Sequence, residues 1–441
     1  MAAFADWKIK DEKRDVPEGP MLKSFQEAIG LRSLGLIGLI TLGLVSLVGC
    51  GQPSDRLTLI PEEASPRLLS AWSAVWVEDD ALVIADDAHA YQLASPLFSD
   101  YAEKLRTLRL PNNQQVQLDP DTGRFIYPVG TVITKTFYYD RVEGSDRSDY
   151  RFKVVNDSPK PQQRSLDVSD RTLVETRVLI KRADGWQALP YVWNADQTEA
   201  SLRPAGAILR ATLEQAGEVE AFAYVVPNRN QCAGCHILNQ ADRALLPIGP
   251  HPKNFNAATQ LSDELAQLTT RGWLTPTAAQ TAQALPSNVN WYDEDQPLAA
   301  RARSYLDINC GHCHSATGPA DTSGLYLDIA TENLTRWGVC KAPIAAGQGT
   351  GGARFGIVPG DPDASIVAYR MTTTDPGAMM PELGRSVVHE AGLALVREWI
   401  SMMPGSCNPD SSGPSFVNGI EQASVGSEVL SDRASEFGPA S

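Results

Sequence analysis

The residues with the most distinctive chemistry in this chain of 441 residues are two short clusters of cysteine and histidine. One reads NQCAGCHIL and the other INCGHCHS, and each contains the pattern Cys-x-x-Cys-His. The first motif comprises Cys232, Cys235 and His236, and the second comprises Cys310, Cys313 and His314. With 7 cysteines and 6 histidines in the chain, a shuffled sequence would contain about 0.0015 such motifs. The two copies are therefore not an accident of composition.

This pattern is typical of covalent haem attachment. Two residues between the cysteines put both sulfur atoms on the same side of a tight turn, where each can form a thioether with a vinyl group of the ring. The histidine that follows is then placed to bind the iron as its proximal ligand. We therefore expect two covalently attached haem c groups, with His236 and His314 as proximal ligands.

Two other chemistries also use paired cysteines. A zinc ribbon separates its two cysteine pairs by about 15–20 residues, whereas Cys235 and Cys310 are much farther apart in this sequence. Redox-active dithiols occur in a βαβ context, which neither motif has. A zinc site could still form by spatial pairing, but the adjacent histidines favour haem.

The second motif has a candidate for the other axial ligand. The stretch GAMMPELG contains Met380 followed by Pro381, and the spacing of apolar residues predicts a helix at about 388–402. A distal methionine on a rigid loop ahead of a C-terminal helix is common in c-type domains, and its soft sulfur favours ferrous iron. Met379 and Met371 compete for this role, and Met380 could instead pack in the core. With Met380 as ligand, the haem on the second motif has the higher potential.

The first motif lacks a comparable methionine, since none occurs between 232 and 370. His251 in PIGPHPKNFN is the candidate distal ligand, although a solvated loop histidine fits the same sequence. An open position would instead make this haem a candidate for small-molecule chemistry. We expect His312 to point away from its own iron and His389 to lie on the surface.

The segment 21–49 resembles a bacterial lipoprotein signal. Basic residues precede the uncharged run LGLIGLITLGLVSLVG, which leads into LVGC. The resemblance implies cleavage before Cys50 and a lipid on that cysteine, whereas the alternative is an uncleaved anchor with an incidental cysteine. Either interpretation places the rest of the chain in the cell envelope, facing the periplasm, and Gly51 favours the outer membrane. Residues 1–20 are an extension of unclear role or a mis-assigned start.

The charge balance narrows the choice of partner. The formal net charge is −15, and the segment 1–49 contributes nothing to it because its acidic and basic residues are equal in number. An acidic surface argues against nucleic acid or anionic lipid as a ligand. It favours a redox partner protein that presents a basic patch, with the lipid anchor as the only membrane contact.

Two cysteines lie outside both motifs. Cys340 and Cys407 belong to a chain that we expect to be exported into an oxidising compartment. A disulfide that closes a long loop is the expected arrangement, and two unrelated buried thiols are the alternative.

The first half of the exported chain has the character of β structure. We expect a tether at 50–89 and a β-rich domain at 90–226, since the segments 131–139 and 172–182 are rich in β-branched and aromatic residues. A D-G turn after the second of these predicts a hairpin with 186–194. A sandwich or a partly open barrel is the expected form.

The second half is expected to be helical. We assign 227–296 to a segment that carries the first haem, 297–408 to a mainly α, cytochrome c-like domain, and 409–441 to a disordered tail. Three leucines of the first segment recur at helical spacing, namely Leu261, Leu265 and Leu268. The expected fold class is therefore multidomain α+β.

The chain resembles a family of bacterial diheme c-type cytochrome lipoproteins. The resemblance rests on YQLASPLFSDYAEKLR, YPVGTVITKTF, PYVWNADQTEA, VPNRNQCAGCH, RARSYLDINCGHCH, GIVPGDPDASIVAYRM and MMPELG, which extend from about 90 to 405. It implies an exported, lipid-anchored protein with two haems, and it supplies no catalytic residue.

We therefore expect a carrier of single electrons rather than an enzyme. One alternative is a diheme peroxidase or oxidase with an open first haem. Another is a cytochrome subunit of an exported dehydrogenase, with the β-rich domain as its docking module.

Overall fold

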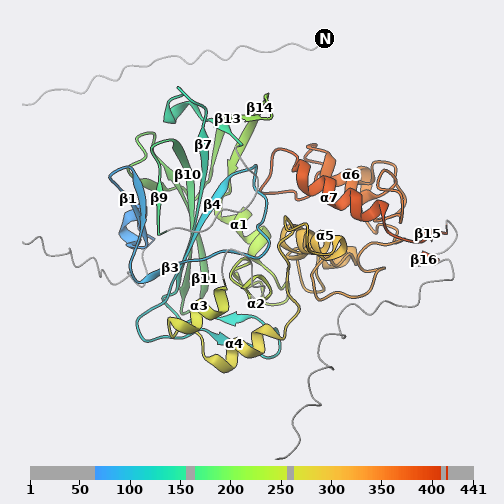
Figure 1. Ribbon diagram of the computed structural model, residues 1–441, viewed down its shortest axis with the longest axis horizontal. Coiled ribbons are helices and arrows are strands. Elements are labelled where there is room, and N and C mark those ends of the chain that lie inside the picture. Colours follow the sequence, from blue (N-terminus) through green and yellow to red (C-terminus); the bar gives the residue numbers. More distant parts are fainter. Residues whose placement is uncertain (1–64, 155–163, 256–262, 409–413, 416–441) are drawn as a thin grey trace, which may run out of the picture. The chain divides into compact units, whose positions relative to one another are not determined.

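The computed structural model describes residues 65–154, 164–255, 263–408 and 414–415 (Figure 1). All of them belong to one compact unit, Asp55–Ser441. The expected signal segment, Cys50, Leu261 and most of the expected tail lie outside the described residues. Within the described part of the chain, no helix combines the length and apolar character needed to cross a membrane.

The fold is α+β, with a β-rich region followed by a region of several short helices, as the sequence predicts at this level. The longer strands are β4 (Glu103–Arg109), β7 (Val132–Arg141), β10 (Arg171–Arg182), β11 (Gly185–Trp193), β13 (Ala207–Gln215) and β14 (Glu218–Val226). The shorter ones are β1 (Val75–Glu78), β2 (Ala81–Ile84), β3 (Ala88–Ala90), β5 (Gln117–Leu118), β6 (Phe125–Ile126), β8 (Arg151–Lys153), β9 (Ser165–Asp167), β12 (Ala200–Leu202), β15 (Ser406–Cys407) and β16 (Pro414–Ser415).

The main sheet has nine strands and is mixed. Its order is β12-β11-β10-β7-β8-β13-β14, with β4 pairing with both β7 and β3. Only the pair β8 and β13 is parallel among the pairings of the named strands. The hairpin expected at the D-G turn is confirmed, because β10 and β11 pair in a register that ends at Arg182 opposite Gly185. Buried threonine pairs tie the central strands, with 2.6 Å between the Thr107 and Thr134 hydroxyls.

The expectation of a tether at 50–89 is wrong from residue 65 onward. Residues from 65 onward are folded, since β1 and β2 form a three-stranded sheet with β9 and β3 joins the main sheet. Trp72 is 1% exposed and donates from its indole to the Tyr191 hydroxyl at 2.7 Å. These strands have only three or four residues each, which is too short for a periodic pattern to reveal them.

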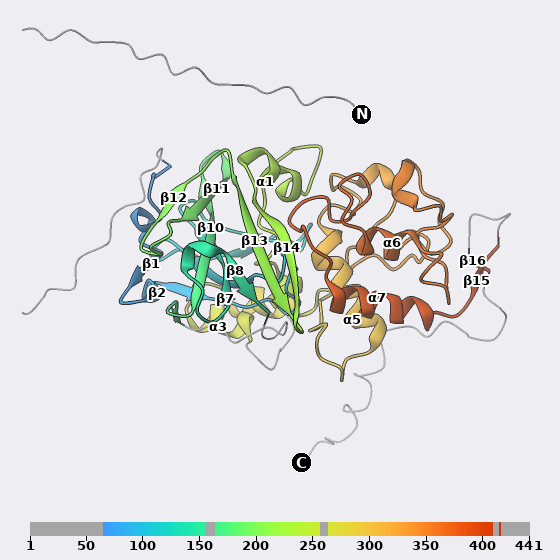
Figure 2. The ribbon, with the colours of Figure 1, turned by 90° about the horizontal axis from the view of Figure 1, so that it is seen from above.

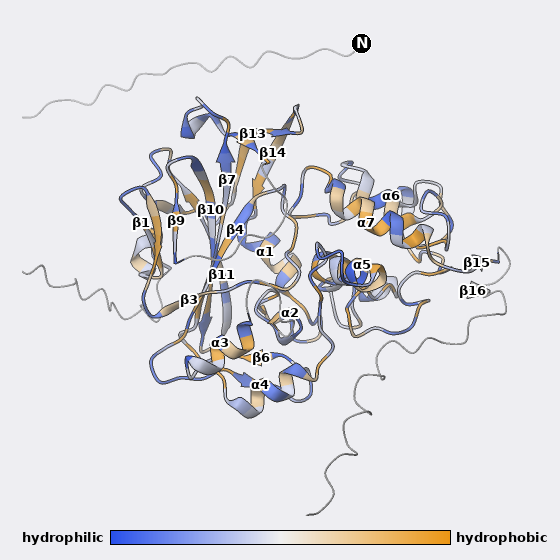
Figure 3. Ribbon diagram, in the orientation of Figure 1, coloured by the Kyte–Doolittle hydropathy of each residue, from blue (hydrophilic) through white to orange (hydrophobic). Residues whose placement is uncertain are grey.

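The helices follow the strands. They are α1 (Arg229–His236), α2 (Pro252–Phe255), α3 (Glu264–Thr270), α4 (Pro276–Gln283), α5 (Leu298–Leu306), α6 (Ile366–Thr372) and α7 (Glu390–Ser401). In Figures 1 and 2, α5, α6 and α7 lie together, away from β1 and β2. The helix expected at 388–402 is confirmed as α7, whose apolar and polar residues alternate in Figure 3 as one buried face requires.

Helices α5 and α7 pack closely where Gly392 meets Tyr305. A Cβ atom added at Gly392 would lie 2.2 Å from Cζ of Tyr305, so only glycine permits this approach. Beyond Leu306 the chain continues as a π-helical turn, Asp307–Gly311, which carries Cys310. The start of the second motif is therefore fixed by the packing of two helices.

Hydrogen bonds join the helical region to the strands. The Phe98 amide donates to Asn309 Oδ1 at 2.9 Å, directly beside Cys310. The amides of Ser386 and Val387 donate to Asp100 Oδ1 at 2.5 and 3.1 Å. Because the residues joined are far apart in the sequence, the two regions fold against each other.

Candidate functional site

The first motif occupies the short helix α1, directly after strand β14. A capping box starts the helix: Gln231 N donates to Asn228 Oδ1, and Asn228 N donates to Gln231 Oε1, each at 2.9 Å. The helix ends at His236, and the chain is extended from Ile237. Cys232 and Cys235 therefore lie three residues apart, on one side of this helix.

His236 is held in the form that can bind iron. Its Nδ1 lies 2.8 Å from the Leu246 carbonyl oxygen, which can only accept a hydrogen bond. Nδ1 therefore carries the proton and Nε2 keeps its lone pair. Burial lowers the pKa of His236 to about 4, so the ring is neutral at physiological pH.

The second motif is anchored by a buried carboxylate. Asp307 accepts from Lys253 Nζ at 2.8 Å, from Asn288 Nδ2 at 2.6 Å and from the Ile329 amide at 2.8 Å. These bonds fix the turn that presents Cys310. The His314 amide then donates to the Cys310 carbonyl at 2.9 Å, and burial lowers the pKa of the His314 ring to about 4.

The two motifs lie side by side, which the sequence does not predict. Thr317 Oγ1 donates to the Leu238 carbonyl at 3.0 Å, and the Cys313 thiol donates to the Gly234 carbonyl at 3.9 Å. The Cys313 thiol also contacts the sulfur of Cys235 and lowers its pKa, with His312 adding to the effect. A thiol with a lowered pKa is the more reactive one.

One cavity joins the two motifs, with about 1120 Å³ of space between its walls, including its opening to solvent. Five of the expected site residues line it, namely Cys232, Cys235, His236, Cys310 and Met380. Apolar side chains such as Leu97, Phe98, Ile248 and Leu383 form much of the rest. Cys313, His314 and His251 lie outside this lining.

Met380 and Met371 both line the cavity, whereas Met379 is not among its lining residues. The backbone of Met380 is fixed on both sides, since its amide donates to the Arg370 carbonyl at 2.9 Å and its carbonyl accepts from Arg385 Nε at 3.1 Å. Met371 belongs to α6 and is 9% exposed. Of the three candidate methionines, two therefore remain at the cavity.

His389 is not a surface residue, contrary to the expectation from sequence. It is 5% exposed, lines the cavity and stacks on Phe98 with ring centroids 4.0 Å apart. Its Nδ1 lies 3.0 Å from the Tyr305 hydroxyl. A position ahead of a helix is commonly exposed, but here aromatic residues from distant segments cover it. A sequence pattern limited to neighbouring residues carries no signal for such a contact.

Two further histidines, His312 and His251, differ in their relation to the cavity. His312 lines the cavity, and its buried Nδ1 has no hydrogen-bond partner within the described residues. His251 is half-buried, and its Nδ1 accepts from the Lys253 amide at 3.1 Å. Burial lowers the pKa of His251 well below its ordinary value. Its role as a distal ligand stays a prediction.

The zinc alternative gains no support from side-chain placement. Among the described residues, no group of three or more His, Cys, Asp or Glu side chains is arranged to hold a metal ion. Haem differs in this respect, because the ring nitrogens hold the iron and the protein adds only one or two ligands.

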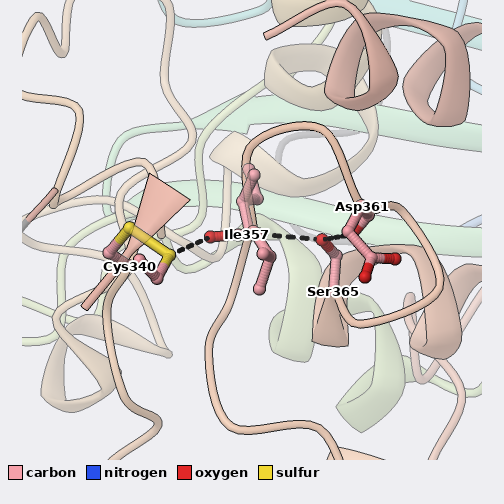
Figure 4. Close-up of a disulfide and its surroundings, with 6 residues drawn as sticks. Cys340, Ile357, Asp361 and Ser365 are labelled. Carbon is pink, nitrogen blue, oxygen red and sulfur yellow. Dashed lines mark hydrogen bonds between the residues drawn. A yellow bond between two sulfur atoms is a disulfide. The ribbon is translucent and has the colours of Figure 1, made fainter. Parts of the chain in front are cut away.

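The expected disulfide is present between Cys340 and Cys407, with 5.2 Å between their Cα atoms (Figure 4). Cys340 is fully buried, and its amide donates to the Ile357 carbonyl at 2.9 Å. The loop beyond Ile357 is closed by Ser365, whose hydroxyl accepts from Val358 N and donates to the Asp361 carbonyl. The four motif cysteines remain free thiols.

Comparison of the chain with known protein families, with curated proteins and with solved structures finds no match.

Proposed function

We propose that this protein is an electron carrier of the bacterial envelope, with two haem c groups attached at its Cys-x-x-Cys-His motifs. The observation that carries the proposal is the difference between the motif cysteines and the other two described cysteines. Within the described residues, the four motif cysteines are unbridged and three of them line one cavity, while Cys340 and Cys407 form a disulfide with each other. Covalently bound haem supplies one-electron oxidation and reduction of iron.

The residues present fit such a group. Cys232 and Cys235 offer sulfur atoms beside a neutral imidazole whose Nε2 is unprotonated. Apolar side chains form much of the cavity lining, and Met371 and Met380 are among the lining residues. Together these residues would hold and orient a flat, largely apolar ring, which is what electron transfer requires of the protein.

We further propose that residues 297–408 form a cytochrome c-like domain. The support is local: α5 runs into the second motif, α7 packs on α5 through Gly392, and the Met380 loop precedes α7. The β-rich region, which the sequence favours as a sandwich or partly open barrel, then supports the first haem through β14 and α1.

His312 and His389 line the cavity, and an imidazole bound to the iron there would favour electron transfer over peroxidase or oxidase chemistry. An enzyme of that kind needs an open iron position, whereas these side chains bring two imidazoles to the cavity walls. Carbon monoxide added to the reduced protein tests this choice. Unchanged spectra support the electron carrier, and a rapidly formed carbonyl adduct would support the enzyme.

The proposed location depends on Cys50, which lies outside the described residues. A lipid on this residue would anchor the protein in the envelope, facing the periplasm, where haem attachment to cysteines takes place. The acidic chain would then meet a redox partner with a basic patch, such as an exported dehydrogenase. Cys50→Ser should release the protein from the membrane fraction or block its maturation, and unchanged fractionation would refute the anchor.

The central experiment is the mass of the denatured full-length protein, expressed in a bacterium that matures c-type cytochromes. We expect two haem additions. Replacing Cys232 and Cys235 by serine should remove one of them, whereas replacing Cys340 and Cys407 should remove none. A protein that carries no covalent haem would refute the proposal.

A further inference from the structure

Three cationic side chains form a row across the centre of the main sheet. Arg106 on β4 pairs in register with Lys135 on β7, and Lys135 pairs in register with Arg177 on β10. Residues paired in this way point to the same face of a sheet. Arg106 is 5% exposed, and Lys135 and Arg177 both line the cavity that joins the two motifs.

Such a row of like charges destabilises the folded protein unless a negative charge lies close to it. Like charges directly opposite each other destabilise a sheet, and an unpaired charge removed from water costs several kcal/mol in the general case. Burial and the neighbouring cations, Lys104 among them, lower the pKa of Lys135 well below its ordinary value. The three side chains therefore stay charged together only beside a source of negative charge, because without one Lys135 is pushed toward its neutral form.

The nearby protein carboxylate, Glu175, is already engaged. It is fully buried and accepts from Arg177 Nη2 at 2.6 Å, from Arg177 Nε at 2.9 Å and from the Tyr224 hydroxyl at 2.8 Å. Within the described residues, the Lys135 ammonium forms no hydrogen bond or ion pair and lies 4.8 Å from the centre of the Phe137 ring. The Arg177 guanidinium shares that ring, at 4.3 Å. For Lys135 and Arg177, one carboxylate and one aromatic face leave excess positive charge.

The position of the row relates it to the cofactor site. Arg177 influences the Cys232 thiol electrostatically, and Lys135 influences the His236 ring in the same way. A haem carries two propionate carboxylates on the edge away from its vinyl groups. The row lies beside Cys232 and His236, so a ring attached there would direct its carboxylates away from the row. A ring attached at the second motif, whose Cys310 lines the same cavity, would instead extend across the cavity toward Lys135 and Arg177.

We propose that Lys135 and Arg177, with Arg106 beside them on the sheet, form an anion site that binds the propionate carboxylates of a haem in this cavity. The inference rests on the proposed function. Bidentate guanidinium contacts and an ammonium contact are the usual means of holding such groups. The site would account for cations in register in a central sheet, and it would contribute to the electrostatic field at the iron.

The test uses the mature protein with both haems and compares Lys135→Met with Lys153→Met, an exposed lysine on β8. Loss of a cation near the iron disfavours the added electron. We expect Lys135→Met to lower one of the two midpoint potentials by about 59 mV, which is about a tenfold change in the reduction equilibrium. Lys135→Arg should retain the potential, and Glu175→Gln should raise it.

Two readouts make the result specific. The propionate bending band in the resonance Raman spectrum should shift in Lys135→Met and stay in place in Lys153→Met. Repeating the titration after Cys232→Ser and Cys235→Ser identifies whose carboxylates are bound, because only the second haem then remains. If both haems attach but Lys135→Met and Glu175→Gln match Lys153→Met in potential and spectrum, the anion site is refuted while the proposed function stands. Absence of covalent haem in the unmodified protein refutes both.

Discussion

The two Cys-x-x-Cys-His segments contain the same five-residue pattern but are supported in different ways. The first is a short helix that follows a strand and is fixed by its own capping box and one carbonyl. The second is the continuation of α5, which packs on α7 and rests on the buried Asp307. Attachment chemistry needs only the local pattern. The surroundings that would tune each iron come from distant parts of the chain.

The largest expected difference between the two regions concerns the disulfide, which lies in the helical region only. Replacing Cys340 and Cys407 by alanine removes a crosslink between residues 67 apart in sequence. For a loop of this length we expect a loss of about 4 kcal/mol in the free energy of unfolding.

Denaturant titration monitored at the two proposed haems checks this prediction. The signal of the second haem should be lost at a lower denaturant concentration in the variant, and that of the first should move less. Reduction of the unmodified protein is the control, since it opens the disulfide and leaves thioethers intact. Equal shifts at both haems would show that the regions unfold as one unit.

The next effect concerns Asp100, which joins the strand region to the loop before α7. Burial raises the pKa of this carboxyl from 3.8 to about 6. The folded state therefore favours the protonated form. The stability that this group contributes is complete below about pH 3.8 and is lost as the pH rises through about 6.

Asp100→Asn removes this titration and keeps an oxygen that can accept from both amides. The stability of the variant relative to the unmodified protein should rise by up to about 3 kcal/mol between pH 4 and pH 7. Thermal or urea unfolding across this range measures it. A relative stability that does not change with pH would mean that Asp100 is not buried as described.

The sequence predicts the elements whose signals are local. The D-G turn defines the β10–β11 hairpin, and the apolar spacing of Leu395, Val396, Trp399 and Ile400 defines α7, because each depends on residues close along the chain. The motif cysteines and histidines are equally visible. The sequence predicts a disulfide between Cys340 and Cys407 because both cysteines lie outside the two motifs.

The features that the sequence does not predict depend on contacts between segments that are distant along the chain. His389 is buried because Phe98 stacks on it, and the two motifs meet because the segments after them pair at Thr317 and Leu238. The cationic row needs the register of β4, β7 and β10, which no single strand encodes. Strand pairing of this kind is set by packing over the whole domain.

A smaller effect tests the close packing that supports only the second motif. In Gly392→Ala the added Cβ would lie 2.2 Å from the Tyr305 ring, so the helices must separate. Overpacking of this kind costs about 1–3 kcal/mol. The penalty should shrink in a Tyr305→Ala background, as measured by unfolding of the single and double variants. If the effects of the two changes are additive, the contact does not limit how closely α5 and α7 approach.

The smallest expected effect is also the one that distinguishes the two proposed haems most directly. Met380 and Met371 both border the cavity, and we expect Met380 to be the distal ligand because its backbone is fixed through Arg370 and Arg385. A bound methionine sulfur favours ferrous iron, so Met380→His should lower the potential of the second haem by at least tenfold in equilibrium, or about 59 mV. The near-infrared band of a sulfur–iron bond should disappear in this variant and persist in Met371→Leu, which conserves the apolar volume. A band that survives Met380→His but is lost in Met371→Leu would assign the ligand to α6. If the unmodified protein has no such band, the inequality between the two haems has another origin.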